Sequence, residues 1–480
     1  MDTKKDDKGI STSKENFSEW YVEVLKKSEF VEGSDVSGAL IFRPAAYAVW
    51  EILSDAVDKE FKRVGIENVY FPLFIPEKYL RREAEHFEGF SPEVAWVTEA
   101  GKTKLDEKLA VRPTSETIIY PSYSKWIRSW RDLPLRYNIW NNVVRWEFKH
   151  PTPFLRTREF LWNEGHTIYA TEEEALAERD VILGIYEKAL RDYLALPGIV
   201  GRKSEKEKFA GAIASYSIEH LMPDGWAIQG PDFHFDGQNF SKAFEIEFLD
   251  KDGKKKFAWQ NTFAISTREL GVMVAVHGDN KGLVLPPMVA SPQVVIIPIF
   301  SSENMDEVLG FASKVAGHLH GIRVKIDSRE GYTPGYKFND WELRGVPIRI
   351  EVGKKEIAGN YVVAARRDTG KKIEIQISNI KEKIEALLVE IQHELYDRAL
   401  AKLRAGIHNV ESYDELKDVI KKAKGIAHAP WCGSQKCEDA IKEDTGAKIL
   451  NMPMDQGDLH GNCVYCGKKA EYMANFARSY

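Results

Sequence analysis

The chain has 480 residues, 43% hydrophobic and 29% charged content, and a formal net charge of −6. This length predicts several domains, and the net charge excludes a protein covered overall in nucleic-acid-binding cations. The charged start MDTKKDDKGISTSKEN is not typical of a targeting peptide, and no apolar run reaches the roughly 18 residues of a membrane span. We therefore expect a soluble protein without a membrane segment. Because all four cysteines lie in the last tenth of the chain, we further expect a reducing, cytoplasmic compartment.

The first part of the chain predicts mixed helices and strands. Apolar residues recur at helical spacing in 45–64, and Gly65 ends that helix. The run IENVYFPLFIP after it predicts a strand at an edge or interface, because Pro72 cannot donate to a ladder. Further segments continue to about residue 287: helices near 116–130 and 172–196, strands near 137–148 and 154–163.

Beyond residue 287 the composition changes. VVIIPIF at 294–300 predicts a buried strand, and strand–helix alternation follows, typical of a small α/β domain with a mixed or parallel sheet. A long amphipathic helix is predicted at 380–404. The fold class is therefore α/β and multidomain, with these expected parts: a flexible tail at 1–16, a large first domain at 17–287, the α/β domain at 288–405 and a C-terminal module at 406–480.

The segment VVRWEFKHPTPFLRTREFLW at 143–162 gathers arginines, glutamates and aromatic residues around a Pro-Thr-Pro turn. If both flanks are strands, Arg145 and Glu147 share one face of the first strand, and Arg156, Phe160 and Trp162 share one face of the second. The turn could set both rows over the same side of a sheet. Such a surface suits phosphate and base binding. A solvated hairpin with cross-strand ion pairs is the alternative.

Two other motifs carry polar groups near predicted helix starts. RPTSET at 112–117 is a good N-cap signal that also offers Thr114 and Glu116 as ligands. STREL at 266–270 opens an apolar helix, so Arg268 would lie at an N-terminus that favours anions, or would form a surface pair.

All four cysteines lie in the C-terminal module, as Cys432-x4-Cys437 and Cys463-x2-Cys466. Two short-spaced pairs predict a closed, structural Zn²⁺ site, with disulfides as the alternative. Residues 337–372 carry nine Lys or Arg against five Asp or Glu. This excess suits a phosphate-contacting surface, although a solvated charged face is commoner.

These motifs together resemble a known family. VRWE (144–147) and RTREF (156–160) resemble the second signature motif of class II aminoacyl-tRNA synthetases. The longer run FKHPTPFLRTREFLWNEGHT is similar to prolyl-tRNA synthetases of the archaeal and eukaryotic type. The likeness continues through RPTSET, STREL, HGDNKGLVLPP, WELRGVPIRIEVG and the cysteine-bearing tail, and so spans the chain from about residue 17.

The resemblance implies a class II catalytic core, an antiparallel sheet flanked by helices, followed by an anticodon-binding α/β domain and a zinc-binding domain. It implies that L-proline is activated with ATP to prolyl-adenylate and transferred to the 3′ end of tRNA(Pro), with Mg²⁺ bound through ATP. It further implies a homodimer formed through the first motif. The bacterial type inserts an editing domain between His166 and STREL, and this chain has none there.

The resemblance also implies roles for individual residues. Arg145 and Arg268 would be catalytic and would contact phosphates. The remaining positions are, for proline, Thr114, Glu116, Arg145, Trp162, Glu164, Phe209 and His234; for ATP, Arg145, Glu147, Arg156, Thr157, Phe160, Gln229 (with Mg²⁺) and Arg268; for the anticodon, Lys337, Glu342, Arg344 and Arg349; and for Zn²⁺, Cys432, Cys437, Cys463 and Cys466.

The sequence departs from the family pattern after Gln229, because Pro231 and Asp232 stand where several relatives have a small residue and threonine. The role of Asp232 is therefore open. Three rival functions remain: another class II synthetase, an inactive tRNA-binding paralogue, and a DNA-binding zinc finger in the tail. Amino-acid-dependent ATP–pyrophosphate exchange would distinguish the first two.

Overall fold

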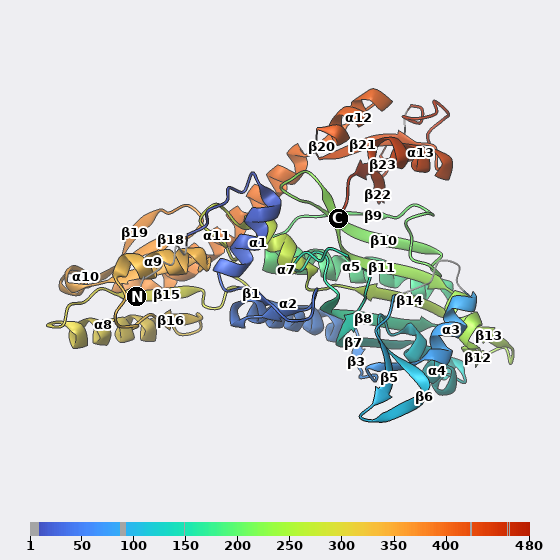
Figure 1. The fold of residues 1–480 in the computed structure, drawn as a ribbon, viewed down its shortest axis with the longest axis horizontal. Helices are drawn as coiled ribbons and strands as arrows, with labels where there is room; N and C mark the ends of the chain where they lie inside the picture. The colour runs from blue at the N-terminus through green and yellow to red at the C-terminus, as the bar shows by residue number, and fades with distance from the viewer. Residues whose placement is uncertain (1–8, 87–92, 148, 423–424, 458, 460) are drawn as a thin grey trace.

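The computed structural model describes residues 9–86, 93–147, 149–422, 425–457, 459 and 461–480. Figure 1 shows a central body, a smaller α/β body built from β15–β19 with α8–α10, and a C-terminal module containing α12 and α13. The long helix α11 (Ile380–Ala405) runs between the last two. This arrangement confirms the predicted α/β, multidomain fold class.

An 11-stranded sheet forms the backbone of the central body, in the order β20-β21-β23-β22-β9-β10-β11-β14-β8-β7-β3. Neighbouring strands from β21 to β7 are antiparallel, as expected of a class II core. Its strands in the central body are β3 (Glu67–Asn68), β7 (Leu135–Val144), β8 (Glu159–Tyr169), β9 (Ile199–Arg202), β10 (Ala214–Leu221), β11 (Ala227–Gly237) and β14 (Trp259–Ala264).

Helices α1 (Phe17–Lys27), α2 (Pro44–Arg63), α5 (Glu172–Leu194) and α7 (Arg268–His277) bury their apolar faces in one cluster with β10, β11 and β14. Helices α4 (Glu116–Trp126) and α6 (Asn239–Phe244) belong to a second cluster. The expected helices at 45–64, 116–130 and 172–196 are thus present. Smaller elements complete this body: β1 (Val31–Gly33), β2 (Leu40–Phe42), β4 (Phe74–Pro76), α3 (Glu77–His86), β5 (Trp96–Ala100), β6 (Thr103–Val111), the short 3-10 helix η1 (Trp130–Asp132), β12 (Glu247–Leu249) and β13 (Lys255–Phe257).

The α/β body has a mixed sheet in the order β16-β15-β17-β18-β19, as its sequence predicts. The strand β15 is parallel to β16 and β17, whereas β17, β18 and β19 are antiparallel. Its elements are β15 (Val294–Pro298), α8 (Met305–His318), β16 (Val324–Ile326), α9 (Pro334–Leu343), β17 (Ile348–Val352), α10 (Lys354–Gly359), β18 (Tyr361–Arg366), β19 (Lys372–Gln376) and η2 (Ile377–Asn379).

The C-terminal module is joined to the central sheet through backbone pairing. Met452 on β22 (Lys448–Pro453) pairs with Arg202 on β9, and Pro453 pairs with Gly201. The approach is close, since a Cβ added to Gly201 would lie 2.4 Å from the carbonyl oxygen of Met452. The other elements of this module are β20 (Ile407–Asn409), α12 (Tyr413–Lys421), β21 (Ile426–Trp431), α13 (Gln435–Thr445) and β23 (Tyr472–Ala477).

The strands predicted at 137–148 and 154–163 are both shorter in the structure on the side of the turn that joins them, so these two predicted bounds are wrong. The strand β7 stops at Val144 and β8 begins at Glu159, so Arg145 lies in a long connection at 145–158. Phe154 adopts a positive φ of 61° in this connection, between two prolines and β8, and interrupts any continuous ladder. The alternation of faces predicted from residue 145 to 158 therefore does not apply.

Two other expectations have mixed outcomes. The run 66–76 does reach the sheet edge, where β3 is the outermost strand, but Pro72 itself lies outside any strand. The described part of the predicted flexible tail packs on the core: Thr12 donates its N–H to Glu23 at 2.9 Å, and Lys14 Nζ donates to the carbonyl of Gly278 at 2.5 Å. No helix among the described residues combines the length and apolarity of a membrane span.

Candidate active site

Two adjoining cavities lie along the first part of β8, from Phe160 to His166, and Arg145 lines both of them. The larger has a volume of about 130 Å³ and the smaller about 40 Å³. Every residue predicted to contact proline lines the larger cavity: Thr114, Glu116, Arg145, Trp162, Glu164, Phe209 and His234. Four of the residues predicted to contact ATP line the smaller one: Arg145, Thr157, Phe160 and Arg268.

Arg145 is held at the junction of the two cavities. Its Nε donates to the carbonyl of Pro113 at 2.9 Å, which ties the start of the 145–158 connection to the segment before α4. Its guanidinium lies 5.1 Å from the ring centroid of Trp162 and 5.5 Å from that of Phe160. Such cation–π contacts fix the guanidinium while leaving N–H groups for an anion.

Glu164 connects α4 to the sheet. Its carboxylate accepts the N–H of Ser115 at 2.9 Å, the hydroxyl of Thr114 at 3.0 Å and the amide of Asn141 at 2.8 Å. Burial opposes ionisation, but the charge of His166 and these donors hold the pKa of Glu164 well below its usual range. Glu164 is therefore an ionised structural anchor that keeps Thr114 and Glu116 in the cavity. The hydroxyl of Thr114 has a single proton, which is shared between the carboxylates of Glu164 and Glu116.

Aromatic rings form the opposite wall of the larger cavity. The Phe209 ring stacks on the imidazole of His234 at 4.7 Å between centroids, and His234 Nδ1 lies 2.9 Å from the hydroxyl of Ser215. Trp162 Nε1 donates to Asn141 Oδ1 at 2.7 Å. Each of these rings is therefore fixed by a hydrogen bond or a stack.

The smaller cavity is suited to an anion. Arg268 is the first residue of α7, as predicted, and its guanidinium donates to the carbonyl of Gln229 at 2.9 Å. Burial and the positive charge of Arg145 both lower the pKa of Arg268. The repulsion between these two guanidinium groups, which lie beside a helix N-terminus, is relieved when phosphate oxygens bind between them.

Some predicted residues do not line either cavity. Glu147 and Arg156 are exposed in the 145–158 connection. Gln229 lies beside the cavities, where its side-chain amide donates to Asp232 Oδ2 at 3.0 Å. Asp232, whose role the sequence leaves open, lines the larger cavity.

The four anticodon candidates do not form one open patch. Lys337 is buried, and its ammonium donates to the carbonyl of Asp327 at 3.0 Å. Arg344 pairs with Glu29 at 2.5 Å, Glu342 pairs with Lys281 at 2.9 Å, and Arg349 pairs with Glu351 at 2.8 Å. Nucleotide recognition by these residues stays a prediction, and Lys337 is the least accessible of them.

Sequence reasoning missed several side chains that build the site. Asn141 bridges Glu164 and Trp162, and Ser215 fixes His234. Strand alternation puts Asn141 on the same face of β7 as Val143, but only the pairing of β7 with β8 shows that it lies opposite Trp162. No local signal marks Ser215, because its partner lies on the neighbouring strand.

Asp236 on β11 is fully buried, and neither carboxylate oxygen has a hydrogen-bond partner of good geometry among the described residues. Burial, together with the charge of Glu116, raises the pKa of Asp236 to about 7. The folded protein thus holds this proton between about pH 4 and 7, where an unfolded aspartate has lost it. The free energy of unfolding therefore falls as pH rises through that window, because the folded state keeps a proton that the unfolded state releases.

Replacing Asp236 with asparagine is expected to raise the free energy of unfolding above pH 7 by on the order of 2 to 4 kcal/mol, because asparagine does not ionise. Apparent Tm measured at pH 5 and pH 8 should show a gain for Asp236→Asn that is larger at pH 8. Asp250→Asn, a substitution in the exposed β12–β13 turn, serves as the control and should show equal shifts. An equal gain for Asp236→Asn at both pH values would contradict the expectation.

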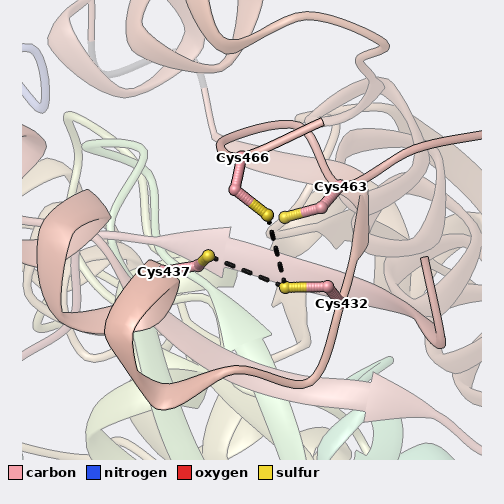
Figure 2. A group of neighbouring side chains, drawn as sticks. All are labelled: Cys432, Cys437, Cys463 and Cys466. Carbon is pink, nitrogen blue, oxygen red and sulfur yellow. Dashed lines mark hydrogen bonds between the residues drawn. The ribbon is translucent and has the colours of Figure 1, made fainter. Parts of the chain in front are cut away.

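The four cysteines converge in the C-terminal module, as Figure 2 shows. The Sγ atom of Cys432 lies 3.6 Å from that of Cys437 and 3.7 Å from that of Cys466. A tetrahedron with Zn–S bonds of about 2.3 Å has edges of about 3.8 Å, so the thiol set fits a zinc ion. All four are free thiols, and the alternative prediction of disulfide pairs is therefore wrong.

The C-terminus lies at the start of β11. The N–H of Tyr480 donates to the carbonyl of Ala227 at 3.0 Å, and the phenol hydroxyl donates to Asp224 Oδ2 at 2.5 Å. Burial and the Asp224 carboxylate raise the pKa of this phenol well above its usual range. The end of the chain is therefore anchored at the start of β11, two residues before Gln229 in the sequence.

Comparison with known protein families gives three matches along the chain. Residues 96–277 match the tRNA synthetase class II core domain (G, H, P, S and T), residues 293–387 match an anticodon binding domain, and residues 413–480 match the prolyl-tRNA synthetase C-terminal domain. The three matches follow the order of the three bodies in Figure 1.

Similar proteins cover nearly the whole chain. A proline–tRNA ligase of Natranaerobius thermophilus is 46% identical, over 96% of this chain and 95% of the relative. One from the archaeon Cenarchaeum symbiosum is 47% identical, over 98% and 99%. A crystal structure of prolyl-tRNA synthetase from Cryptosporidium parvum, complexed with halofuginone and AMPPNP, superposes with a TM-score of 0.94 at 45% identity, covering 98% of this chain and 100% of that one.

Proposed function

Because the chain belongs to the prolyl-tRNA synthetase family and is a proline–tRNA ligase, we propose that proline binds in the larger cavity and the ATP phosphates in the smaller one. Glu116 then pairs with the secondary ammonium of proline, and the hydroxyl of Thr114 supports it. Trp162, Phe209 and His234 enclose the ring, and Glu164 holds the loop that presents Glu116. The observation that carries this proposal is the position of Arg145, which lines both cavities.

Arg145 contacts the proline carboxylate and the α-phosphate together. The carboxylate attacks the α-phosphorus and pyrophosphate leaves, so both nucleophile and leaving group belong to substrates. Arg145 and Arg268 stabilise the charge that develops on the phosphoryl oxygens, and orientation supplies the rest of the acceleration. The terminal ribose hydroxyl of tRNA then attacks the prolyl carbonyl and releases AMP.

The other nucleotide contacts complete this assignment. Phe160 stacks on the adenine, and Thr157 lines the phosphate cavity. Class II synthetases use ATP with Mg²⁺, and Gln229 is our candidate to hold the phosphate-bound ion, because it lies next to Arg268. Glu147 and Arg156 reach the adenine and the outer phosphates from the exposed 145–158 connection.

The experiment that tests the assignment is proline-dependent exchange of labelled pyrophosphate into ATP. Exchange with proline, but not with threonine or glycine, supports it over the two rival class II activities. An inactive tRNA-binding paralogue would show no exchange with any amino acid.

Cysteine is expected to support detectable ATP–pyrophosphate exchange. The site is built for a small ring, and a few methylenes are worth only about 1 to 3 kcal/mol of discrimination. The described interval from Thr167 to Ile265 consists of α5, β9–β14 and α6 of the core, with no separate body that could hydrolyse a mischarged product. Exchange rates with proline and cysteine give kcat/KM for each, and a discrimination above about 10⁵ would contradict the prediction.

A homodimer is the expected assembly. Large apolar side chains are exposed on neighbouring elements: Tyr70 (79% exposed) lies between β3 and β4, Trp96 starts β5, and Trp126 ends α4. Sedimentation should give twice the chain mass of 54.7 kDa. The substitution Tyr70→Lys should weaken the dimer, whereas Tyr332→Lys in the α/β body should not. A monomeric wild-type protein at micromolar concentration would contradict this.

We assign Zn²⁺ to the four-cysteine cluster as a structural ion. Residues 293–387 bind the anticodon of tRNA(Pro), and Glu342, Arg344 and Arg349 are the candidates there that are partly accessible. Four reduced thiols are typical of a cytoplasmic protein, which is the compartment we propose.

A further inference from the structure

Two acid–histidine pairs lie in the wall of the larger cavity. His166 Nε2 is 3.9 Å from Glu164 Oε1, and His234 Nε2 is 3.6 Å from Asp232 Oδ2. The first pair is fully buried, and the side chains of the second are 15% and 21% exposed. In each pair the histidine can carry a charge that its carboxylate compensates.

Once these two pairs are set aside, two charged groups remain on the described lining of the cavity. They are the Glu116 carboxylate and the Arg145 guanidinium. A proline zwitterion carries one ammonium and one carboxylate, which these two groups can bind.

Asp232 is fixed as the partner of His234. The Gln229 amide donates to the same carboxylate oxygen at 3.0 Å, and the Gln229 carbonyl accepts from Arg268. On its other side, His234 is held by Ser215 and by the Phe209 stack. Burial lowers the pKa of His234, but the Asp232 carboxylate raises it above its ordinary value.

We propose that Asp232 is a positioning residue for proline: its carboxylate, 3.6 Å from Nε2, holds His234 in the cavity wall together with Ser215 on Nδ1, so that the imidazole and the Phe209 ring stacked on it keep the shape of the cavity. Without Asp232, His234 loses its partner on one side of the ring and is free to turn away from Phe209. Without His234, the Phe209 ring loses its stacking partner and Asp232 has no ring left to hold. This proposal rests on the assignment of the larger cavity to proline.

The test is a double-mutant cycle on the full-length protein, with KM for proline and kcat measured by ATP–pyrophosphate exchange. Asp232→Asn and His234→Asn are each expected to raise KM for proline about tenfold or more, with kcat changed less than about threefold. Adding Asp232→Asn to His234→Asn should raise KM no further, since the acid then has no imidazole to hold in place. Asp250→Asn should leave both parameters unchanged.

Two outcomes would overturn the proposal. One is an unchanged KM in Asp232→Asn, and the other is a double variant whose KM rises by the product of the two single effects. Glu116→Gln separates this proposal from the underlying assignment. If Glu116→Gln raises KM for proline and Asp232→Asn does not, the positioning role of Asp232 is wrong. If Glu116→Gln leaves KM unchanged, the larger cavity is not the proline site and both proposals fail.

Discussion

Replacing Arg145 with alanine is expected to lower proline-dependent ATP–pyrophosphate exchange by about a thousandfold or more. Loss of a single preorganised donor to a developing charge costs about 10² to 10³ in rate. Arg145 lines both cavities and packs between two rings, so its removal also frees Phe160 and Trp162. We expect kcat to fall and KM to rise for both proline and ATP.

The matched control is Arg131→Ala. Arg131 is an exposed arginine that also stacks on a tryptophan, with its guanidinium 4.7 Å from the Trp130 ring, but it lines neither cavity. Its removal should leave exchange unchanged. Arg145→Lys keeps one positive charge without the planar fork and should recover only part of the activity. Exchange in Arg145→Ala within tenfold of the wild type would refute the placement of both substrates around this residue.

Replacing Cys437 with serine is expected to abolish zinc binding and to unfold much of the C-terminal module. Cys437 is buried on α13, and its thiol lies 3.6 Å from that of Cys432. Structural zinc sites contribute apparent binding free energies on the order of 10 kcal/mol, and removing one ligand from a four-thiol set removes most of this. Metal analysis should give one zinc per wild-type chain and almost none in the variant.

Hydrogen exchange over residues 425–457 and 461–480 should rise sharply in Cys437→Ser. The control, Ser434→Ala, alters the residue before α13, whose side chain makes no cap hydrogen bond. It should retain zinc and native exchange. A wild-type protein that is folded to its C-terminus and contains no zinc would contradict the assignment.

Much of the site could be predicted because the motif residues are close in sequence to the elements that carry them. Arg268 opens α7 where the STREL motif predicts a helix start, and Trp162 and Glu164 follow the alternation of β8. The seven residues expected around proline come from five separate segments, yet all of them line one cavity. Resemblance to a family supplied that grouping, which local periodicity could not.

The parts that could not be predicted depend on pairing across strands and on loop geometry. The sequence leaves the role of Asp232 open because Pro231 and Asp232 depart from the family pattern, and only the fold shows that its carboxylate lies beside Gln229 and His234. The 145–158 connection was expected as two strands, since its alternation of polar and apolar residues is strand-like. Phe154 at positive φ and the neighbouring prolines end the ladder instead.

Because β22 is hydrogen-bonded to β9, a truncation at the sequence limit between the modules would break a continuous sheet. A fragment that stops before α12 would leave β9 as a bare outer strand, with unsatisfied N–H and C=O groups facing water. Such a fragment would be prone to stick to other copies edge to edge. It would also lose Tyr480, whose backbone clamps the start of β11. Residues 413–480 therefore cover an edge of the catalytic sheet.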